Sequence, residues 1–139
     1  MISFNYESDF ILLNEEIFSN WIQDVITSES YVLGEINYNF CNDDYLHKIN
    51  LEYLKHDTLT DIITFDNTVG KTIYSDIFIS VERVKDNAND FKVAFEEELK
   101  RVIIHGVLHL CGFKDKSEED EKLMRSKEDE KIAMFHMEH

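Results

Sequence analysis

The sequence predicts a single α+β domain spanning residues 1–139, in which a small mixed β-sheet packs against helices and one helix is central. Two observations support this class. Short segments of alternating or β-branched residues are interspersed with longer segments whose apolar residues recur at helical spacing. The chain of 139 residues is 43% hydrophobic, which is enough for one core without covalent cross-links.

The N-terminal half is expected to form two strands and two helices. Residues 2–6 alternate like a short strand, and residues 31–40 are predicted as a second strand. Between them, residues 14–28 show helical spacing behind an asparagine that can cap the helix. A second helix is expected to be capped by Asp43 or Asp44. The positions at helical spacing are Ile17, Trp21, Ile22, Val25 and Ile26 in the first helix and Leu46, Ile49, Asn50, Tyr53 and Leu54 in the second.

The C-terminal half is expected to form two strands and three helices. Residues 62–66 and 73–80 are predicted as neighbouring strands, and residues 81–88 as a short helix. Residues 95–111 form the strongest predicted helix, acidic at its start and then almost wholly apolar, so we expect it to be central and buried. Ser117 can cap a last helix. Its inner face is expected at Leu123, Met124, Ile132 and Phe135.

Charge, cysteines and hydropathy limit the cellular context. The chain has 29 acidic and 14 basic residues, and a net charge of −15 repels nucleic acid unless a local basic site is present. Residues 118–131 mix acidic and basic side chains, as is typical of a solvated helix face. Cys41 and Cys111 match no disulfide or zinc-ribbon pattern and are expected to be free core thiols. Without a signal-peptide pattern or an apolar run of roughly 18 residues, we expect a cytoplasmic protein that binds no membrane.

The predicted central helix carries a spacing typical of metal sites. His105 and His109 lie four residues apart, so both imidazoles leave the same helix face one turn apart. Gly112 can adopt the left-handed conformation that ends a helix and turns the chain back, which brings Asp115 beside the histidines. A single histidine in an apolar helix is usually a hydrogen-bonded core residue, but two at this spacing favour a metal. We therefore predict that His105, His109 and Asp115 bind one ion.

The same spacing occurs in metzincin peptidases, where a glutamate acting as general base follows the first histidine. Here that position is Gly106. Peptide hydrolysis is therefore disfavoured. A metal with an open coordination position can still activate water and polarise a phosphoryl oxygen, so hydrolysis of another bond is expected.

Three motifs in order resemble the YbeY family. The run of residues 105–113, His-Gly-Val-Leu-His-Leu-Cys-Gly-Phe, is similar to the family signature. Residues 60–65 resemble its Thr-Asp-Val-Leu-Ser-Phe strand, and Asp76 with Ile77 resembles the Asp-Ile of its next strand. Residues 119–132 resemble its acidic closing helix. The likeness covers roughly residues 46–132.

The resemblance implies a metal-dependent, single-strand-specific endoribonuclease of ribosome biogenesis. It implies zinc as cofactor, and single-stranded ribosomal RNA as substrate, in maturation of the 3′ end of the small-subunit RNA. Ribosomal proteins or the small ribosomal subunit are the expected partners, since basic partners suit an acidic protein.

Two positions depart from the family pattern. The family signature usually ends in a histidine that is the third zinc ligand, whereas Asp115 stands at that place here. Because a set of two histidines and one carboxylate also accepts iron, manganese or nickel, another divalent transition metal is an alternative to zinc. Leu54 stands where many members place an arginine implicated in RNA handling, and Lys55 is the nearest cation.

The expected catalytic helpers are Arg101, Lys55 and Asp61. Arg101 lies one turn before the first histidine and can neutralise transition-state charge, or else pair with Glu97 or Glu98. Lys55, with Lys114 and Lys116, can hold flanking phosphates. Asp61 can orient a ligand histidine, or else cap a strand end.

Two alternative functions remain possible interpretations of the sequence. One is a non-haem iron enzyme that uses the same three ligands. The other is a non-catalytic ribosome-assembly protein in which the metal only joins helix to loop, with a closed coordination shell.

Overall fold

A four-stranded mixed β-sheet forms the base of the molecule. The computed structural model describes residues 1–54 and 60–138. The strands are β1 (Ile2–Tyr6), β2 (Val32–Cys41), β3 (Ile62–Asp66) and β4 (Thr72–Ser80), in the order β1-β2-β4-β3. The β1/β2 and β2/β4 pairs are parallel, and β3 runs antiparallel to β4. The predicted α+β class with a mixed sheet is confirmed.

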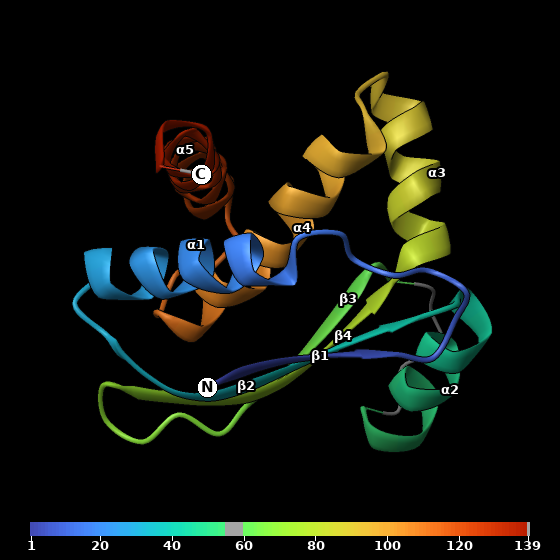
Figure 1. Ribbon diagram of the computed structural model, residues 1–139, viewed down its shortest axis with the longest axis horizontal. Coiled ribbons are helices and arrows are strands. Elements are labelled where there is room, and N and C mark those ends of the chain that lie inside the picture. Colours follow the sequence, from blue (N-terminus) through green and yellow to red (C-terminus); the bar gives the residue numbers. More distant parts are fainter. Residues whose placement is uncertain (55–59, 139) are drawn as a thin grey trace.

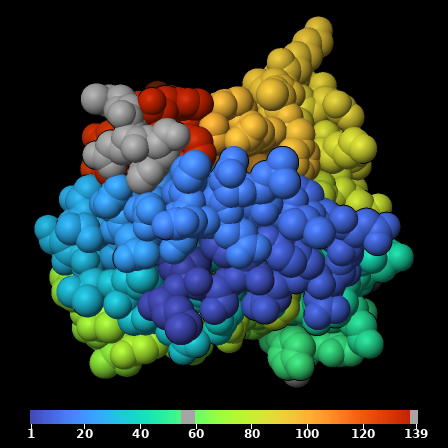
Figure 2. Space-filling model, viewed as in Figure 1, coloured from blue at the N-terminus to red at the C-terminus, as the bar shows by residue number. Residues whose placement is uncertain are grey.

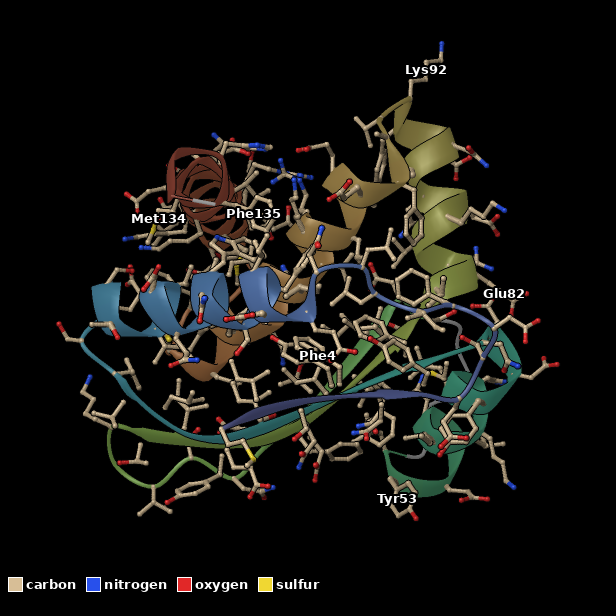
Figure 3. The ribbon with its side chains drawn as sticks, in the orientation of Figure 1. Phe4, Tyr53, Glu82, Lys92, Met134 and Phe135 are labelled. Carbon is tan, nitrogen blue, oxygen red and sulfur yellow. The ribbon has the colours of Figure 1, made fainter. Side chains whose placement is uncertain are left out.

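Helices cover the two faces of this sheet unequally (Figure 1). One face carries α1 (Glu15–Ser28), α3 (Val81–Phe91), α4 (Phe95–Leu110) and α5 (Glu118–Glu138). Of the helices in the described residues, only α2 (Asp43–Tyr53) lies on the other face, and Figure 3 shows Tyr53 on that side. Figure 2 shows α1 and the segment before it lying across the front of the molecule. Within the described residues, no helix is long and apolar enough to cross a membrane.

The main core lies between the sheet and α1, α4 and α5. The central helix α4 is buried as predicted, with Ile103, Ile104, Val107 and Leu108 at 0% exposure. Trp21 on α1 donates its indole N–H to the backbone carbonyl of Lys131 on α5 at 2.7 Å, which joins the two outer helices. A smaller apolar cluster packs α2 against the opposite face of the sheet. Because α4 is held on several sides, its C-terminal half is a rigid platform.

Several local expectations differ in detail. Asn14 precedes α1 in a left-handed conformation and makes no side-chain cap. Asn42, not Asp43 or Asp44, caps α2, because its side chain accepts from the backbone N–H of Tyr45 at 2.9 Å. Ser117 caps the last helix as predicted, because its Oγ accepts from the backbone N–H of Asp120 at 3.0 Å.

Burial follows most of the predicted apolar positions. The exceptions are Tyr53, Leu54 and Leu123, which are 68%, 41% and 50% exposed. Both cysteines, Cys41 and Cys111, are buried and free, as expected.

Candidate metal centre

The end of α4 and the turn that follows bring three possible metal ligands together. His105 and His109 lie one turn apart, with their Nε2 atoms 3.0 Å apart. Oδ2 of Asp115 lies 3.2 Å from Nε2 of His105 and 3.4 Å from Nε2 of His109. One ligand atom from each residue lies within 4.8 Å of the others. These are the three residues that the spacing predicted as ligands.

Gly112 turns the chain so that Asp115 returns to α4. Its φ of +94° lies in the left-handed region that favours glycine, as the sequence predicted. The N–H of Gly112 donates to the carbonyl of His109 at 3.0 Å, and the N–H of Phe113 donates to the carbonyl of Leu108 at 3.0 Å. These bonds close the last turn of α4 and set the direction of the chain towards Asp115.

Each histidine is held from behind by a hydrogen bond at Nδ1. The Nδ1–H of His109 donates to the Phe113 carbonyl at 2.9 Å. Nδ1 of His105 lies 2.7 Å from Oε2 of Glu128, and an ionised carboxylate only accepts hydrogen bonds. When neutral, both rings therefore carry their proton at Nδ1 and present the Nε2 lone pair to Asp115. Partners of this kind orient the histidine ligands of metal sites.

Glu128 is a site residue that sequence reasoning missed. The mixed charges of its helix predicted a solvated face, but the Glu128 side chain is only 6% exposed. Arg101 donates to Oε1 of Glu128 at 2.9 Å and to Oδ1 of Asp129 at 2.8 Å. A signal was present in the sequence, since Glu128 lies four residues after Met124 and four before Ile132, both buried. That spacing places Glu128 on the inner stripe of α5.

Hydrogen bonding and charge favour the ionised form of Glu128. Burial alone would raise the pKa of Glu128, but the hydrogen bonds and charges of His105 and Arg101 outweigh it and lower that pKa. Burial alone would lower the pKa of His105, yet the Glu128 carboxylate, with help from Asp115 and Asp61, raises it. The site therefore attracts positive charge to the point where the three ligand atoms meet.

The donor set fits a divalent metal ion. Two imidazole Nε2 atoms and one carboxylate oxygen converge at 3.0–3.4 Å, and groups that all accept hydrogen bonds repel one another unless a proton or cation lies between them. Imidazole nitrogen and carboxylate oxygen are both common ligands of zinc and of other divalent transition metals. His105, His109 and Asp115 could therefore hold one such ion.

Two surface cavities reach this cluster. One of about 580 Å³ lies along α5, where Glu118, Lys122 and Arg125 line it together with His105 and Asp115. The other, of about 490 Å³, lies beside β3, where Thr60, Asp61 and Thr64 line it together with all three possible ligands. The side chains of His105, His109 and Asp115 are 24%, 33% and 38% exposed. An ion in the cluster would be accessible to a substrate.

Gly106 faces the sheet and not the possible ligands. A Cβ at this position would lie 2.9 Å from Cδ1 of Ile62 and 3.2 Å from Oγ1 of Thr64. The close approach of α4 to β3 therefore depends on the missing side chain. A glutamate here, as in metzincin peptidases, would have to displace side chains of β3. The peptidase alternative thus lacks its general base.

Two of the predicted helpers adjoin the cluster. Asp61 lines the cavity beside β3, and its burial raises the pKa of its carboxyl group despite the attraction of His105. Arg101 lies one turn before His105, but its guanidinium is bound by Glu128 and Asp129 of α5. Within the described residues, the ion pairs of Arg101 are therefore with α5 and not with Glu97 or Glu98, the alternative partners expected from the sequence.

The remaining predicted contacts are exposed or lie beyond the described part of the chain. Lys55 lies outside the described residues. Leu54, which stands in place of the family arginine, is at the C-cap of α2. Lys114 and Lys116 are exposed on either side of Asp115, so both lie at the rim of the candidate site.

Comparison with known proteins identifies the family. The chain matches the family described as Endoribonuclease YbeY over residues 3–136. Endoribonuclease YbeY of Flavobacterium johnsoniae is 69% identical over 138 residues, which cover 99% of each chain. The protein of the same name from Flavobacterium psychrophilum is 64% identical over 137 residues, which cover 99% of this chain and 98% of that one.

A solved structure has a similar fold. The solution structure of TM1509 from Thermotoga maritima matches with a TM-score of 0.65 and 25% sequence identity, covering 99% of this chain and 93% of that one. The resemblance carried by the three sequence motifs is thus confirmed over nearly the whole chain. The chain belongs to the Endoribonuclease YbeY family and is an enzyme of the nuclease class.

Proposed function

We propose that this chain is a metal-dependent endoribonuclease that cleaves single-stranded ribosomal RNA, at the 3′ end of the small-subunit RNA, during ribosome biogenesis. Family membership supports cleavage within RNA strands. The observation that carries the metal dependence is the convergence of Nε2 of His105, Nε2 of His109 and Oδ2 of Asp115.

His105, His109 and Asp115 would hold one divalent ion, and zinc is the first candidate. When bound, such an ion lowers the pKa of a coordinated water and polarises a phosphoryl oxygen. Because one ligand is a carboxylate, iron, manganese and nickel are alternatives. The two adjoining cavities leave space for the RNA backbone beside the ligands.

The helpers act through the ligands or on the RNA. Glu128 holds His105 in orientation, and Arg101 in turn holds Glu128, so we assign Arg101 a positioning role. Asp61 is partly buried beside the cluster, where its charge acts on His105. Lys114 and Lys116, at the rim of the site, would bind the phosphates that flank the cleaved bond, and we propose the same role for Lys55.

The charge of the chain bears on its partners. A net charge of −15 opposes the approach of RNA, so we expect weak intrinsic affinity with strong dependence on salt. Basic ribosomal proteins, or the small ribosomal subunit that carries them, would deliver the RNA in the cytoplasm.

The direct test combines metal analysis with RNA cleavage. The purified chain should contain about one divalent metal ion, lose cleavage of an unstructured RNA after treatment with a chelator, and regain it with zinc or manganese. A duplex of the same sequence should resist cleavage. His109→Ala should remove both metal and activity. Asp115→His, which restores the residue usual in the family, should keep both and shift the metal preference towards zinc.

The outcomes separate the competing functions. A chain that binds metal and ribosomes but leaves every RNA intact would support the non-catalytic assembly role. Oxygen-dependent chemistry of the iron-loaded protein would support the non-haem iron enzyme. A chain that retains no metal after purification in metal-containing buffer, and whose melting temperature is unaffected by chelator, would overturn the proposed metal site.

A further inference from the structure

A third cavity, here called the inner cavity, lies between α3, α4, α5 and the start of β3. Its volume is about 220 Å³. It shares His105, Arg101 and Glu128 with the candidate metal centre. Its other polar or aromatic walls are Asp61, Asn87, Phe91, Glu98 and Arg125. The inner cavity therefore starts at a possible metal ligand and extends towards α3.

Glu98 is a buried carboxylate on the wall of this cavity. The residue is only 5% exposed, yet its carboxylate forms no hydrogen bond or ion pair with any residue in the described ranges 1–54 and 60–138. The preceding residue on the helix contrasts with it, since Glu97 pairs with Lys100 at 3.3 Å. A buried carboxylate without a partner is costly, and such groups are normally paired. The Glu98 carboxylate can therefore accept hydrogen bonds from a ligand that enters the cavity.

The other walls have complementary properties. Asp61 adds a second carboxylate, whose Oδ2 accepts a long hydrogen bond of 3.4 Å from the side-chain amide of Asn87. Phe91 is 60% exposed, so it offers an aromatic face at the entrance. Arg125, whose side chain is also 60% exposed, supplies a cation. The inner cavity thus combines acceptors at depth with a ring and a positive charge near solvent.

We infer that the inner cavity is a subsite for a guanine base of the RNA substrate, next to the cleaved phosphate. This inference rests on the proposed function. A carboxylate with two free oxygens is complementary to two adjacent N–H donors, and among the four RNA bases only guanine presents them, at N1 and N2. In cytosine, adenine and uracil, each donor on the pairing edge is flanked by an acceptor, which a carboxylate would repel.

Size and stacking agree with a single base. Sites for drug-sized ligands are roughly 300–1,000 Å³, so a cavity of 220 Å³ suits one base and not a whole nucleotide. Single-stranded RNA is commonly recognised by stacking unpaired bases on aromatic side chains while their edges are hydrogen-bonded. Phe91 would stack on the base, Glu98 would accept from its edge, and Arg125 would bind the attached phosphate.

The test uses short oligouridines that carry one central guanine, adenine, cytosine or inosine. Inosine keeps N1–H but lacks the amino group at position 2. The wild-type chain should cleave next to guanine about tenfold faster than next to adenine or cytosine, with inosine between them. Glu98→Gln should reduce this ratio to nearly one, because an amide replaces one acceptor by a donor. Glu96→Gln, on an exposed neighbour in the same helix turn, should leave the ratio unchanged.

A binding measurement separates this inference from the proposed function. Guanosine 5′-monophosphate should shift the backbone amide resonances of Asn87 and Phe91, and inosine 5′-monophosphate should shift them less. Phe91→Ala, a surface substitution that leaves the buried carboxylate in place, should weaken the response to guanosine 5′-monophosphate. If no oligonucleotide is cleaved, the proposed function fails while this binding experiment still tests the subsite. Cleavage without base preference, or a guanine preference that survives in Glu98→Gln, would overturn the inference alone.

Discussion

Helix α5 takes part in two buried charge networks on neighbouring turns. The two networks differ in whether every charged or polar group in them has a matching partner. Towards α4, Glu128 binds Arg101 at 2.9 Å and His105 at 2.7 Å. Towards α1, Lys131 binds Glu29 at 2.6 Å and Ser28 Oγ at 2.9 Å. Glu128 and Lys131 are almost equally buried, with side chains 6% and 3% exposed. Burial and ion pairing alone therefore do not distinguish a functional network from a structural one.

The two networks differ in the groups that lie farthest from α5. In the network towards α1, Glu29 also binds Lys127 at 3.2 Å, and Lys131 also binds Glu130 at 2.8 Å, so the charges are matched by partners. In the network towards α4, the last group is an imidazole whose Nε2 faces another imidazole and a carboxylate. Atoms that converge without matching partners mark the site that needs a ligand. The network towards α1 instead joins two helices.

The largest expected difference concerns stability. Lys131→Met removes the cation at the centre of the network towards α1 and leaves Glu29 with Lys127 alone. Breaking a buried pair costs about 3–5 kcal/mol, and we expect the lower end because Lys127 remains. Urea unfolding should show this loss, while the metal affinity of the folded protein stays the same. Lys122→Met, an exposed lysine of the same helix, is the control and should have little effect on stability.

The matching change in the network towards α4 should affect metal binding. Glu128→Gln weakens the partner that orients His105 and should lower metal affinity about 10- to 100-fold, as outer-partner changes typically do. Titration of the metal-free protein against a competing chelator measures this. Asp129→Asn is the control, since Asp129 is the other carboxylate that binds Arg101. The side chain of Asp129 is 60% exposed and does not contact His105, so the metal affinity of this variant should match that of the wild type. Equal losses in both variants would contradict the assigned role of Glu128.

The network towards α1 should also set part of the acid sensitivity. Burial alone would raise the pKa of Glu29, but hydrogen bonds from Lys131 and Lys127 lower it below its ordinary value of 4.5. A lowered pKa in the folded state stabilises the protein above pH 4.5, and this contribution is lost as the pH falls through the folded-state pKa. Urea unfolding of wild type and Glu29→Gln should therefore differ at neutral pH and converge in acid. A difference that grows as the pH falls would argue against this ion pair.

The smallest expected effect comes from an isolated polar atom in the core. The hydroxyl group of Tyr38 is buried and has no hydrogen-bond partner among the described residues. A buried hydroxyl group without a partner lowers the stability of the folded state. Tyr38→Phe should raise the free energy of unfolding by about 1 kcal/mol. Tyr6→Phe is the comparison variant and should lower the free energy of unfolding. The hydroxyl group of Tyr6 donates to Glu15 at 2.6 Å and accepts from the N–H of Leu12 at 3.2 Å, and both bonds would be lost.

Local patterns predicted much of the fold. The bounds of β3 were predicted without error, and those of β1 likewise, because β-branched and alternating segments lie between clear breaks. The ends of helices were less predictable. Asn42 was overlooked as a cap next to two aspartates, since all three residue types suit that position. Leu123 was assigned to the core, although the buried stripe of α5 follows Met124, Glu128 and Ile132.

The local sequence was sufficient to predict the three candidate ligands, because a spacing of four residues on a helix and a glycine that ends the helix fix the geometry of the local backbone. The groups that hold those ligands depend on how the helices pack, and the local sequence did not predict them. Glu128 reaches His105 across 23 positions, and α3, α4 and α5 meet around Glu98 without giving it a hydrogen-bond partner among the described residues. Burial and pairing of a charge depend on segments distant in sequence, and the local pattern around a glutamate is the same whether it meets solvent or a histidine.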